Sequence, residues 1–196
     1  VSHSEETTGV ASGRLQGVQL WVAQPSSTRD GAAGFEHHTD LPRLDFDNAT
    51  ATVLVGEYAD ASSPGRRDTD HVGVELDLRG GRCVVPLRVG HEYAVVPLES
   101  TVTIGPHRLD VGQLGYLGVD HDEVPIDADD PTRVLLLGGA PFPEPLLMWW
   151  NYVARTRDEI IAAHGDWSSG APRFGSVASP LPRIDTAGPP WRSSTD

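Results

Sequence analysis

The first residues whose types could do chemistry are His3 and Glu5, in the opening segment VSHSEETTG. In an extended strand, residues two apart point to the same face, about 7 Å from each other, so this imidazole and this carboxylate could converge on one ion. Neutral imidazole nitrogen and carboxylate oxygen suit Fe(II), Mn or Ni better than a metal that prefers thiolates. Two ligands are too few for a stable site. The spacing alone therefore leaves open a second interpretation, a solvated pair near a chain end.

Other histidines have weaker patterns. His121 and Glu123 share the same spacing, but they stand at a turn before VPID with no second pair beside them, which favours a solvated surface position. His37 and His38 are adjacent and would point to opposite faces of a strand, so a loop position is expected for both.

Three residues are interpreted as structural. His71 precedes Glu75 by four residues, which would suit a helix, but the segment HVGVELDL reads as a strand. His91 stands alone in GHEYAVVPLE, at the end of an expected strand. The single cysteine, Cys83, cannot form an internal disulfide, and its segment CVVPL predicts a buried strand thiol.

Short apolar runs separated by Gly, Pro, Asp and Asn must position these side chains. Strands at this close spacing predict an all-β sandwich or barrel. The runs are TVLVGEY, HVGVELDL, CVVPLRV, EYAVVPLE, TVTIG, LGYLG, EVPID and RVLLLGG.

Two further elements are expected outside this series. The segment from Arg14 to Pro25 alternates in polarity and predicts a strand that ends at the proline. The segment TRDEIIAAHG predicts a helix with Thr156 as N-cap, Glu159 completing a capping box and Gly165 as C-cap. The Pro-rich tail is expected to be extended, with Trp191 as an anchor.

Composition limits the partners. The formal charge of −13 disfavours nucleic acid and anionic membranes, because an acidic surface repels phosphate groups. No apolar stretch approaches the ~18 residues that a membrane helix needs, and no signal-peptide pattern is present. We therefore expect no nucleic-acid or membrane partner and a cytoplasmic location.

Several separated motifs together resemble the pirin family of the cupin superfamily. They are HSE followed by GVQLWV, then GGAPFPEPLLMWWNYVARTRDEI, DW and RFG, and finally PLPRIDTAGPP. The resemblance implies a bicupin architecture with a metal site in the first barrel, built from a His-x-His pair and a later His-x-Glu pair. His3 and Glu5 resemble that second pair. The second barrel of such proteins usually carries no metal.

The resemblance implies an all-β fold: a cupin-type barrel with one short C-terminal helix and remnant strands of a first barrel. The expected boundaries are 1–42 for the end of the first barrel and a connector, 43–150 for the second barrel, and 151–196 for the helix and tail. The upstream His-x-His segment is absent. The chain thus resembles the C-terminal part of a longer protein.

Two functions follow from the resemblance. One is a flavonol (quercetin) 2,3-dioxygenase that uses Fe(II) or another divalent metal in its complete form, acts on a small aromatic substrate, and has Glu5 as a catalytic base. The other is a non-catalytic, redox-sensitive regulatory protein that binds a protein partner. For the isolated chain we expect weak or absent metal binding and no activity. An inactive barrel with an exposed apolar edge strand is a third possibility, and the oligomeric state is left open.

Overall fold

Two compact units make up the chain in the computed structural model, which describes residues 2–6, 13 and 16–191. Unit 1 comprises Val1–Val22 and Pro143–Asp196, and unit 2 comprises Ala23–Phe142. These limits do not coincide with the expected boundaries at residues 42 and 150. The boundaries 1–42, 43–150 and 151–196 stay predictions.

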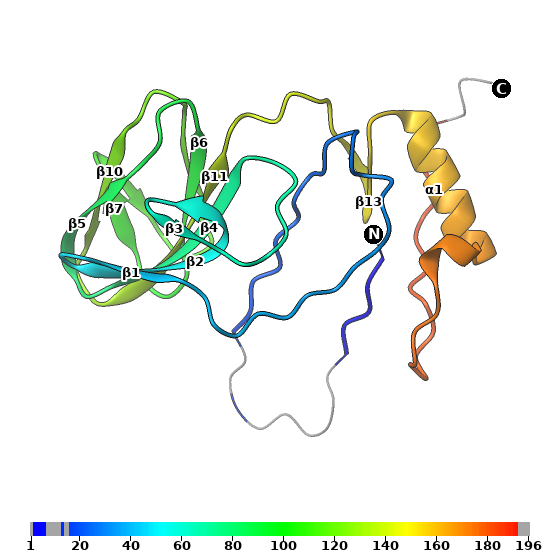
Figure 1. Cartoon of the computed structure of the whole chain (residues 1–196), viewed down its shortest axis with the longest axis horizontal. Coiled ribbons are helices and arrows are strands. Elements are labelled where there is room, and N and C mark those ends of the chain that lie inside the picture. The colour runs from blue at the N-terminus through cyan, green and yellow to red at the C-terminus, as the bar shows by residue number, and fades with distance from the viewer. Residues whose placement is uncertain (1, 7–12, 14–15, 192–196) are drawn as a thin grey trace. The chain divides into compact units, whose positions relative to one another are not determined.

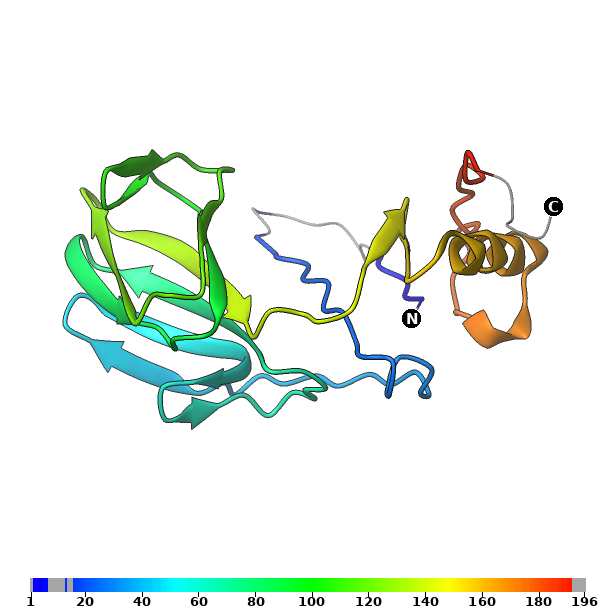
Figure 2. The same ribbon diagram turned by 90° about the horizontal axis from the view of Figure 1, so that it is seen from above.

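Unit 2, all of which is described, contains the strands β1 to β11 (Figure 1). One sheet has the order β1-β2-β4-β11-β6-β9, with β3 paired to β2, and the other has the order β5-β10-β7-β8. The strands wrap around a common core (Figure 2), which confirms the all-β, cupin-type barrel. Their bounds are β1 Arg43–Phe46, β2 Ala49–Tyr58, β3 Ala61–Ser62, β4 His71–Leu78, β5 Gly81–Pro86, β6 Glu92–Pro97, β7 Val102–Ile104, β8 His107–Leu109, β9 Gly115–Leu117, β10 Glu123–Ala128 and β11 Thr132–Gly139.

Alternating burial explains why these segments pair as they do. In β6, Tyr93 and Val95 face the core while their neighbours are only partly buried. Strand β11 lies between β4 and β6, and its neighbouring residues Leu135 and Leu136, which point to opposite faces, are both buried. The apolar run RVLLLGG thus forms an inner strand of the sheet.

Strand β2 changes its inward positions along its length. Its pairing with β4 shifts between Val53 and Val55, which marks a β-bulge. Gly56 follows with a φ of 76°, and a Cβ there would collide with the carbonyl oxygen of His71. The bulge thus requires glycine, and it directs the buried Tyr58 inward at the end of the strand.

Unit 1 contains the remaining regular elements among its described residues. They are the hairpin strands β12 (Leu147–Trp149) and β13 (Tyr152–Ala154), the helix α1 (Arg157–Ser169) and the 3₁₀-helix η1 (Pro172–Phe174). The five tryptophans of the chain, at positions 21, 149, 150, 167 and 191, all belong to this unit.

The tail is held by aromatic contacts. The rings of Trp149 and Trp191 meet edge to face with centroids 5.5 Å apart, and the Arg157 guanidinium lies 5.4 Å from the Trp191 ring. Trp191 Nε1 also donates to the Arg157 carbonyl over 3.4 Å. These contacts confirm Trp191 as an anchor. By contrast, the side chain of Trp150 is mostly exposed.

Candidate functional site

His3 and Glu5 both lie beside one amide group. Gln19 Nε2 donates to Glu5 Oε2 over 3.3 Å and lies 3.4 Å from His3 Nε2. The Gln19 Oε1 atom accepts from Trp21 Nε1 over 3.2 Å, which fixes which way the amide points. The imidazole and the carboxylate therefore face a shared position, and both are exposed to solvent.

The local backbone differs from the expectation. No strand is assigned among the described residues 2–6 or 16–25, so the predicted strand from Arg14 to Pro25 was wrong over its described part, and Arg14 and Leu15 lie outside the described residues. Val18 and Trp21, which belong to opposite faces of the alternating pattern, are each about half exposed. Alternation stabilises a strand only when a neighbouring strand and a core cover one face. The Gln19 amide, not strand pairing, relates His3 to Glu5.

The pair offers half of a metal site. Imidazole nitrogen and carboxylate oxygen are donors that a divalent metal accepts. Among residues 2–6, 13 and 16–191, however, no group of three or more His, Cys, Asp and Glu side chains is arranged to hold an ion. A stable site would need further donors beside His3 and Glu5, and the described part of the chain does not supply them.

Three other histidines, His37, His38 and His121, lie in the kinds of position that the sequence predicts. His121 is exposed, as is Glu123. His37 and His38 lie outside any strand or helix, and His38 Nε2 contacts Glu36 Oε2 at 3.1 Å. This hydrogen bond is the main cause of the lowered pKa of the Glu36 carboxyl.

Two structural assignments also hold. His71 begins strand β4, where its Nδ1 lies 2.8 Å from Thr69 Oγ1, and burial lowers its pKa. Cys83 is buried in β5, and burial raises the pKa of its thiol. Neither residue is a reactive group on the surface.

A cavity of about 210 Å³ lies at one end of the unit 2 barrel. It was not expected, because its aromatic residues were read as parts of buried strands. Its walls come from the end of β2, the turn after it, the segment after β5 and the start of β6. The lining residues are Glu57, Tyr58, Ala59, Pro86, Leu87, Arg88, His91 and Tyr93.

Two tyrosines fix the polar geometry of this cavity. The Tyr58 hydroxyl donates to the Pro86 carbonyl over 3.0 Å, and the Tyr93 hydroxyl accepts from the Arg88 backbone N–H over 3.0 Å. Burial raises the pKa of both phenols. Both side chains are therefore neutral at physiological pH.

Asp70 connects the charged groups beside the cavity. Its Oδ2 atom contacts Arg88 Nη1 at 3.1 Å and His91 Nε2 at 3.2 Å. Its Oδ1 atom lies 3.9 Å from Arg67 Nη1, and Arg67 Nη2 contacts Glu57 Oε1 at 2.9 Å. The local sequence around Asp70 gives no signal for this contact with a histidine 21 positions away.

The two-sheet barrel of unit 2 defines a cupin-type domain. The family model for the Pirin C-terminal cupin domain matches residues 73–175, which is more than half of the chain. The chain therefore belongs to the pirin family.

Relatives support the same assignment. The chain is 36% identical to a Pseudomonas aeruginosa protein named "Putative quercetin 2,3-dioxygenase PA1205", over 98% of this chain and 61% of the relative. It is 26% identical to human Pirin over 81% of this chain and 57% of the relative. A crystal structure of quercetin 2,3-dioxygenase from Acinetobacter baumannii is 34% identical and superimposes with a TM-score of 0.83, covering 88% of this chain and 58% of that one.

The chain spans about 60% of the length of these relatives. Among the described residues, no helix has the length and apolar character to cross a membrane.

Proposed function

We propose that this chain forms the second barrel and part of the metal site of a flavonol 2,3-dioxygenase of the pirin family, with quercetin as the type of substrate. In the complete protein, Fe(II) or another divalent metal would offer open positions to the substrate and dioxygen. His3 and Glu5 would supply two of its ligands. The proposal also places the protein in the cytoplasm.

The observation that carries this proposal is the shared position of His3 and Glu5 at the Gln19 amide. A metal bound there would replace the amide contact with bonds from the same nitrogen and oxygen atoms. The printed names of the Pseudomonas and Acinetobacter relatives support the reaction class.

Glu5 has a second proposed role, as the base that takes a proton from the flavonol hydroxyl. A general base must reach the proton directly or through one water. Glu5 is exposed at the shared position, so a substrate held there could approach its carboxylate.

A regulatory protein is the second candidate function. The relative named Pirin from humans and the acidic composition, with a net charge of −13, are compatible with a protein partner. In that case a change in the oxidation state of the metal would alter a binding surface without turnover.

Metal analysis and quercetin absorbance test both candidates. We expect this chain alone to bind less than one equivalent of iron and to leave quercetin unchanged, because His3 and Glu5 have no third metal ligand beside them among the described residues. A longer form that includes the coding sequence upstream of Val1 should bind iron stoichiometrically and consume quercetin. In that form, His3→Ala and Glu5→Ala should each reduce iron content, whereas His121→Ala, at an exposed histidine of unit 2, should not.

Two results would contradict the proposal. If the short chain bound one full equivalent of iron, it would have to supply more metal ligands than His3 and Glu5. Iron on the longer form without loss of quercetin would reject the dioxygenase and favour the regulatory protein.

A further inference from the structure

One face of the β12–β13 hairpin is apolar and open. Met148 pairs directly with Val153, and these two side chains are 56% and 45% exposed. Leu146, two residues before Met148, is 47% exposed, and Trp150, two residues after it, is 58% exposed. These four residues form the open hairpin surface. A group of large exposed apolar side chains marks an interaction site, whereas single ones scattered over a surface do not.

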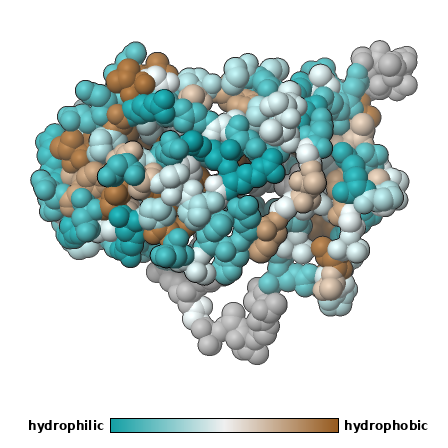
Figure 3. Space-filling model, in the orientation of Figure 1, coloured by the Kyte–Doolittle hydropathy of each residue, from teal (hydrophilic) through white to brown (hydrophobic). Residues whose placement is uncertain are grey.

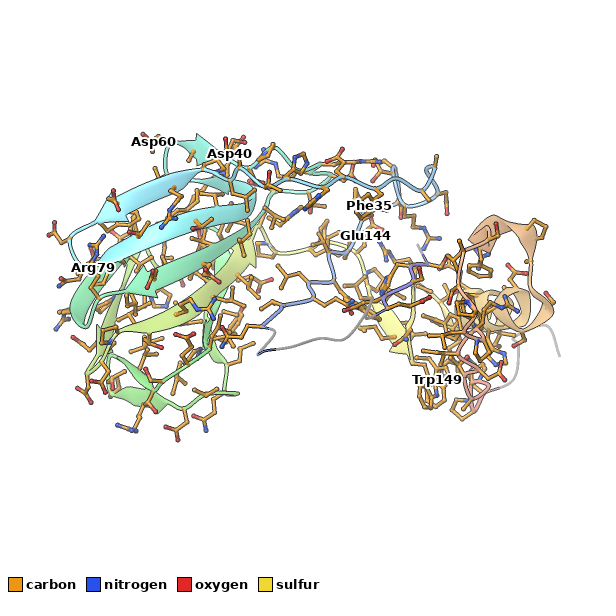
Figure 4. The ribbon with its side chains drawn as sticks, turned by 90° about the horizontal axis from the view of Figure 1, so that it is seen from below. Phe35, Asp40, Asp60, Arg79, Glu144 and Trp149 are labelled. Atoms are coloured by element: carbon orange, nitrogen blue, oxygen red, sulfur yellow. The ribbon has the colours of Figure 1, made fainter. Side chains whose placement is uncertain are left out.

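The opposite face of the hairpin is already covered within unit 1. Trp149 Nε1 donates to the Ala187 carbonyl over 3.0 Å, and Figure 4 shows Trp149 beside the tail. The Tyr152 hydroxyl lies 2.7 Å from Thr186 Oγ1, and its ring meets the His164 ring of helix α1 edge to face. No third strand pairs with β12 or β13 among the described residues. A two-stranded sheet is marginally stable, so a partner on its open face would stabilise it.

The turn of the hairpin holds a tryptophan in a strained conformation. Trp150 has a φ of 50°, in the left-handed region, and it is the first residue of the two-residue turn between β12 and β13. Glycine is usual where a hairpin turn needs a positive φ, and a bulky residue there is an outlier. The turn thus presents an exposed indole at the tip of the hairpin. Strained residues of this kind gather at binding positions.

The open hairpin surface is too small to hold a partner by itself. A stable interface has about 20–30 residues on each side, so this surface can form only part of one. Unit 1 also exposes Val18 and Trp21, each by about half. These two residues flank Gln19, whose amide lies beside His3 and Glu5.

The proposed metal pair lies near the same surface. Residues 2–6 run beside the hairpin in both Figure 1 and Figure 2. His3 and Glu5 need further metal ligands, and the described part of the chain does not supply them. A part of a longer protein that supplied these ligands would therefore reach unit 1 close to the hairpin.

A relative of this chain has additional length that could provide such a part. The match to the Pseudomonas aeruginosa protein covers 98% of this chain but 61% of the relative, so more than a third of that relative lies outside the match. A segment joined covalently to the hairpin has a much higher effective concentration than a free second copy of the chain. The additional length therefore favours an intramolecular partner over a dimer.

We propose that the remainder of the complete protein packs an apolar surface on the open hairpin surface, next to the place where it adds metal ligands to His3 and Glu5. Met148, Trp150 and Val153 would lose most of their exposed area in this contact. The inference rests on the proposed function, because it uses the same incoming ligands. It concerns packing, however, which can be measured without metal.

Met148 is the only methionine of this chain and can report on the contact. Dilute hydrogen peroxide converts an accessible methionine to its sulfoxide. Without metal, we expect Met148 to be oxidised about tenfold more slowly in a form that includes the coding sequence upstream of Val1 than in this chain, because the contact must open first. Mass spectrometry of the peptide that contains Met148 would give both rates. In urea, where the contact is lost, the two forms should react at the same rate.

Two valines offer a matched pair of variants. Val153 on β13 of unit 1 is 45% exposed, and Val84 on β5 of unit 2 is 46% exposed. In the longer form, Val153→Asp should remove most of the protection of Met148, because it places a carboxylate against an apolar partner. Val84→Asp should leave the protection unchanged. Trp150→Gly should also reduce the protection, although it relieves the strained turn.

Three results would overturn the inference. They are equal oxidation rates of Met148 in the two forms, unchanged protection in a folded Val153→Asp variant of the longer form, or protection in this chain alone that rises with its concentration. The last result would make a second copy the partner, and it needs only this chain.

Metal content and Met148 oxidation separate this inference from the proposed function. Protection of Met148 in a longer form that binds no iron would reject the proposed function and retain the packing contact. Iron binding and quercetin consumption with an unprotected Met148 would reject the packing contact and retain the proposed function.

Discussion

At the scale of single residues, the histidines of this chain differ by what surrounds them. His3 is exposed beside the Gln19 amide, His71 is partly buried beside Thr69, and His91 is almost fully buried beside Asp70. The His3 imidazole is thus accessible to a metal, the His71 imidazole makes a structural hydrogen bond, and the His91 imidazole lines a cavity. The role of each histidine depends on its neighbours.

His71 makes the stability of the fold depend on pH. Burial lowers its pKa most, the Arg67 charge lowers it further, and Asp70 and Asp68 act in the opposite direction. The unfolded chain then binds a proton at a higher pH than the folded chain does. The free energy of unfolding should be highest above about pH 6.5, the value for an unfolded histidine, and should fall as the pH drops from there through the lowered pKa.

Urea unfolding at a series of pH values would measure this effect. In His71→Gln, the decrease in unfolding free energy below about pH 6.5 should be smaller than in the wild type. His107→Gln, on the exposed strand β8, is the control and should keep the wild-type pH dependence. An unchanged profile in His71→Gln would reject this explanation.

Ala59, in the turn between β2 and β3, has a φ of 50° and gives a second prediction at this scale. An L-residue in the left-handed region costs about 1–2 kcal/mol, whereas glycine avoids that cost but loses about 0.5–1 kcal/mol through the freedom of the unfolded chain. Ala59→Gly should therefore raise the free energy of unfolding by up to about 1 kcal/mol. Urea unfolding would measure this change.

The neighbouring alanine is the matched control for Ala59. Ala61→Gly, in strand β3, should lower the unfolding free energy by about 0.5–1 kcal/mol. If both glycine variants were destabilised equally, the turn at Ala59 would not be strained.

The sequence indicated which residues could take part in chemistry, but it did not indicate which other residues they contact. The spacing of His3 and Glu5 predicted that they could face one position, but Gln19 was read only as part of a strand pattern. Likewise, His91 was correctly placed at a strand end, but its contact with Asp70 depends on how distant loops meet. Such contacts leave no local pattern in the sequence.

At the scale of elements, the sequence predicted the start of helix α1 correctly but not its end. Thr156 is the N-cap, and its Oγ1 accepts from the Glu159 N–H over 3.2 Å, as predicted. The Glu159 carboxylate accepts from the Arg155 N–H over 2.8 Å, one residue earlier than in a standard capping box.

Thr156→Ala should cost about 1 kcal/mol of stability while Thr156→Ser costs less, as measured by thermal unfolding. Equal losses in both variants would show that the hydroxyl does not cap the helix.

The predicted C-cap at Gly165 was wrong. The helix continues to Ser169, and Gly170 ends it with a φ of 71°, donating its N–H to the carbonyl groups of Asp166 and Trp167. A glycine ends a helix only where the following backbone turns left-handed. Downstream contacts, such as the 2.8 Å bond from Trp167 Nε1 to the Ile184 carbonyl, favour the longer helix, and they are not visible in the local sequence.

The two glycines of this helix should respond in opposite ways to the same change. Nothing lies near a Cβ added at Gly165, so Gly165→Ala should stabilise the helix by about 0.5–1 kcal/mol. Gly170→Ala should destabilise it by about 1–2 kcal/mol, because of the left-handed backbone. Helical circular dichroism during thermal unfolding would compare them. Stabilisation by Gly170→Ala would contradict this account of the helix end.

Among the strands, every one with six or more residues was predicted, and so were the three-residue strands β7 and β9. The eight apolar runs correspond to β2, β4, β5, β6, β7, β9, β10 and β11. The strands that were missed have two to four residues each and coincide with none of these runs. The run from Arg14 to Pro25 shows the opposite error, since it has the pattern but no partner strand in the described residues.

At the scale of the whole molecule, the packing of buried apolar side chains in unit 2 stabilises the barrel. Leu136 is fully buried in the central strand β11. Leu136→Ala should lower the free energy of unfolding by about 2–5 kcal/mol, because it removes apolar contacts and leaves a cavity. Val84→Ala, at a half-exposed position of β5, is the control and should cost less than about 1 kcal/mol. Urea unfolding followed by far-ultraviolet circular dichroism would measure both, and a small effect at Leu136 would contradict this description of the core.

Unit 1 joins the first 22 residues with the segment from Pro143 onward, so residues far apart in sequence belong together. The boundaries implied by the family resemblance, 1–42, 43–150 and 151–196, are contiguous segments and stay predictions. The acidic character was predictable, and hydrophilic residues cover most of the face shown in Figure 3.

The placement of the tryptophans has a practical consequence. Since all five lie in unit 1 and unit 2 has none, the intrinsic fluorescence excited in the indole band originates from unit 1 alone. A single indole introduced into unit 2, for example in place of one of its tyrosines, would add a signal from the barrel, which is obtained as the difference between the emission of this variant and that of the wild-type chain. Emission would then distinguish a ligand that enters the barrel from an ion that binds at the histidine near the start of the chain.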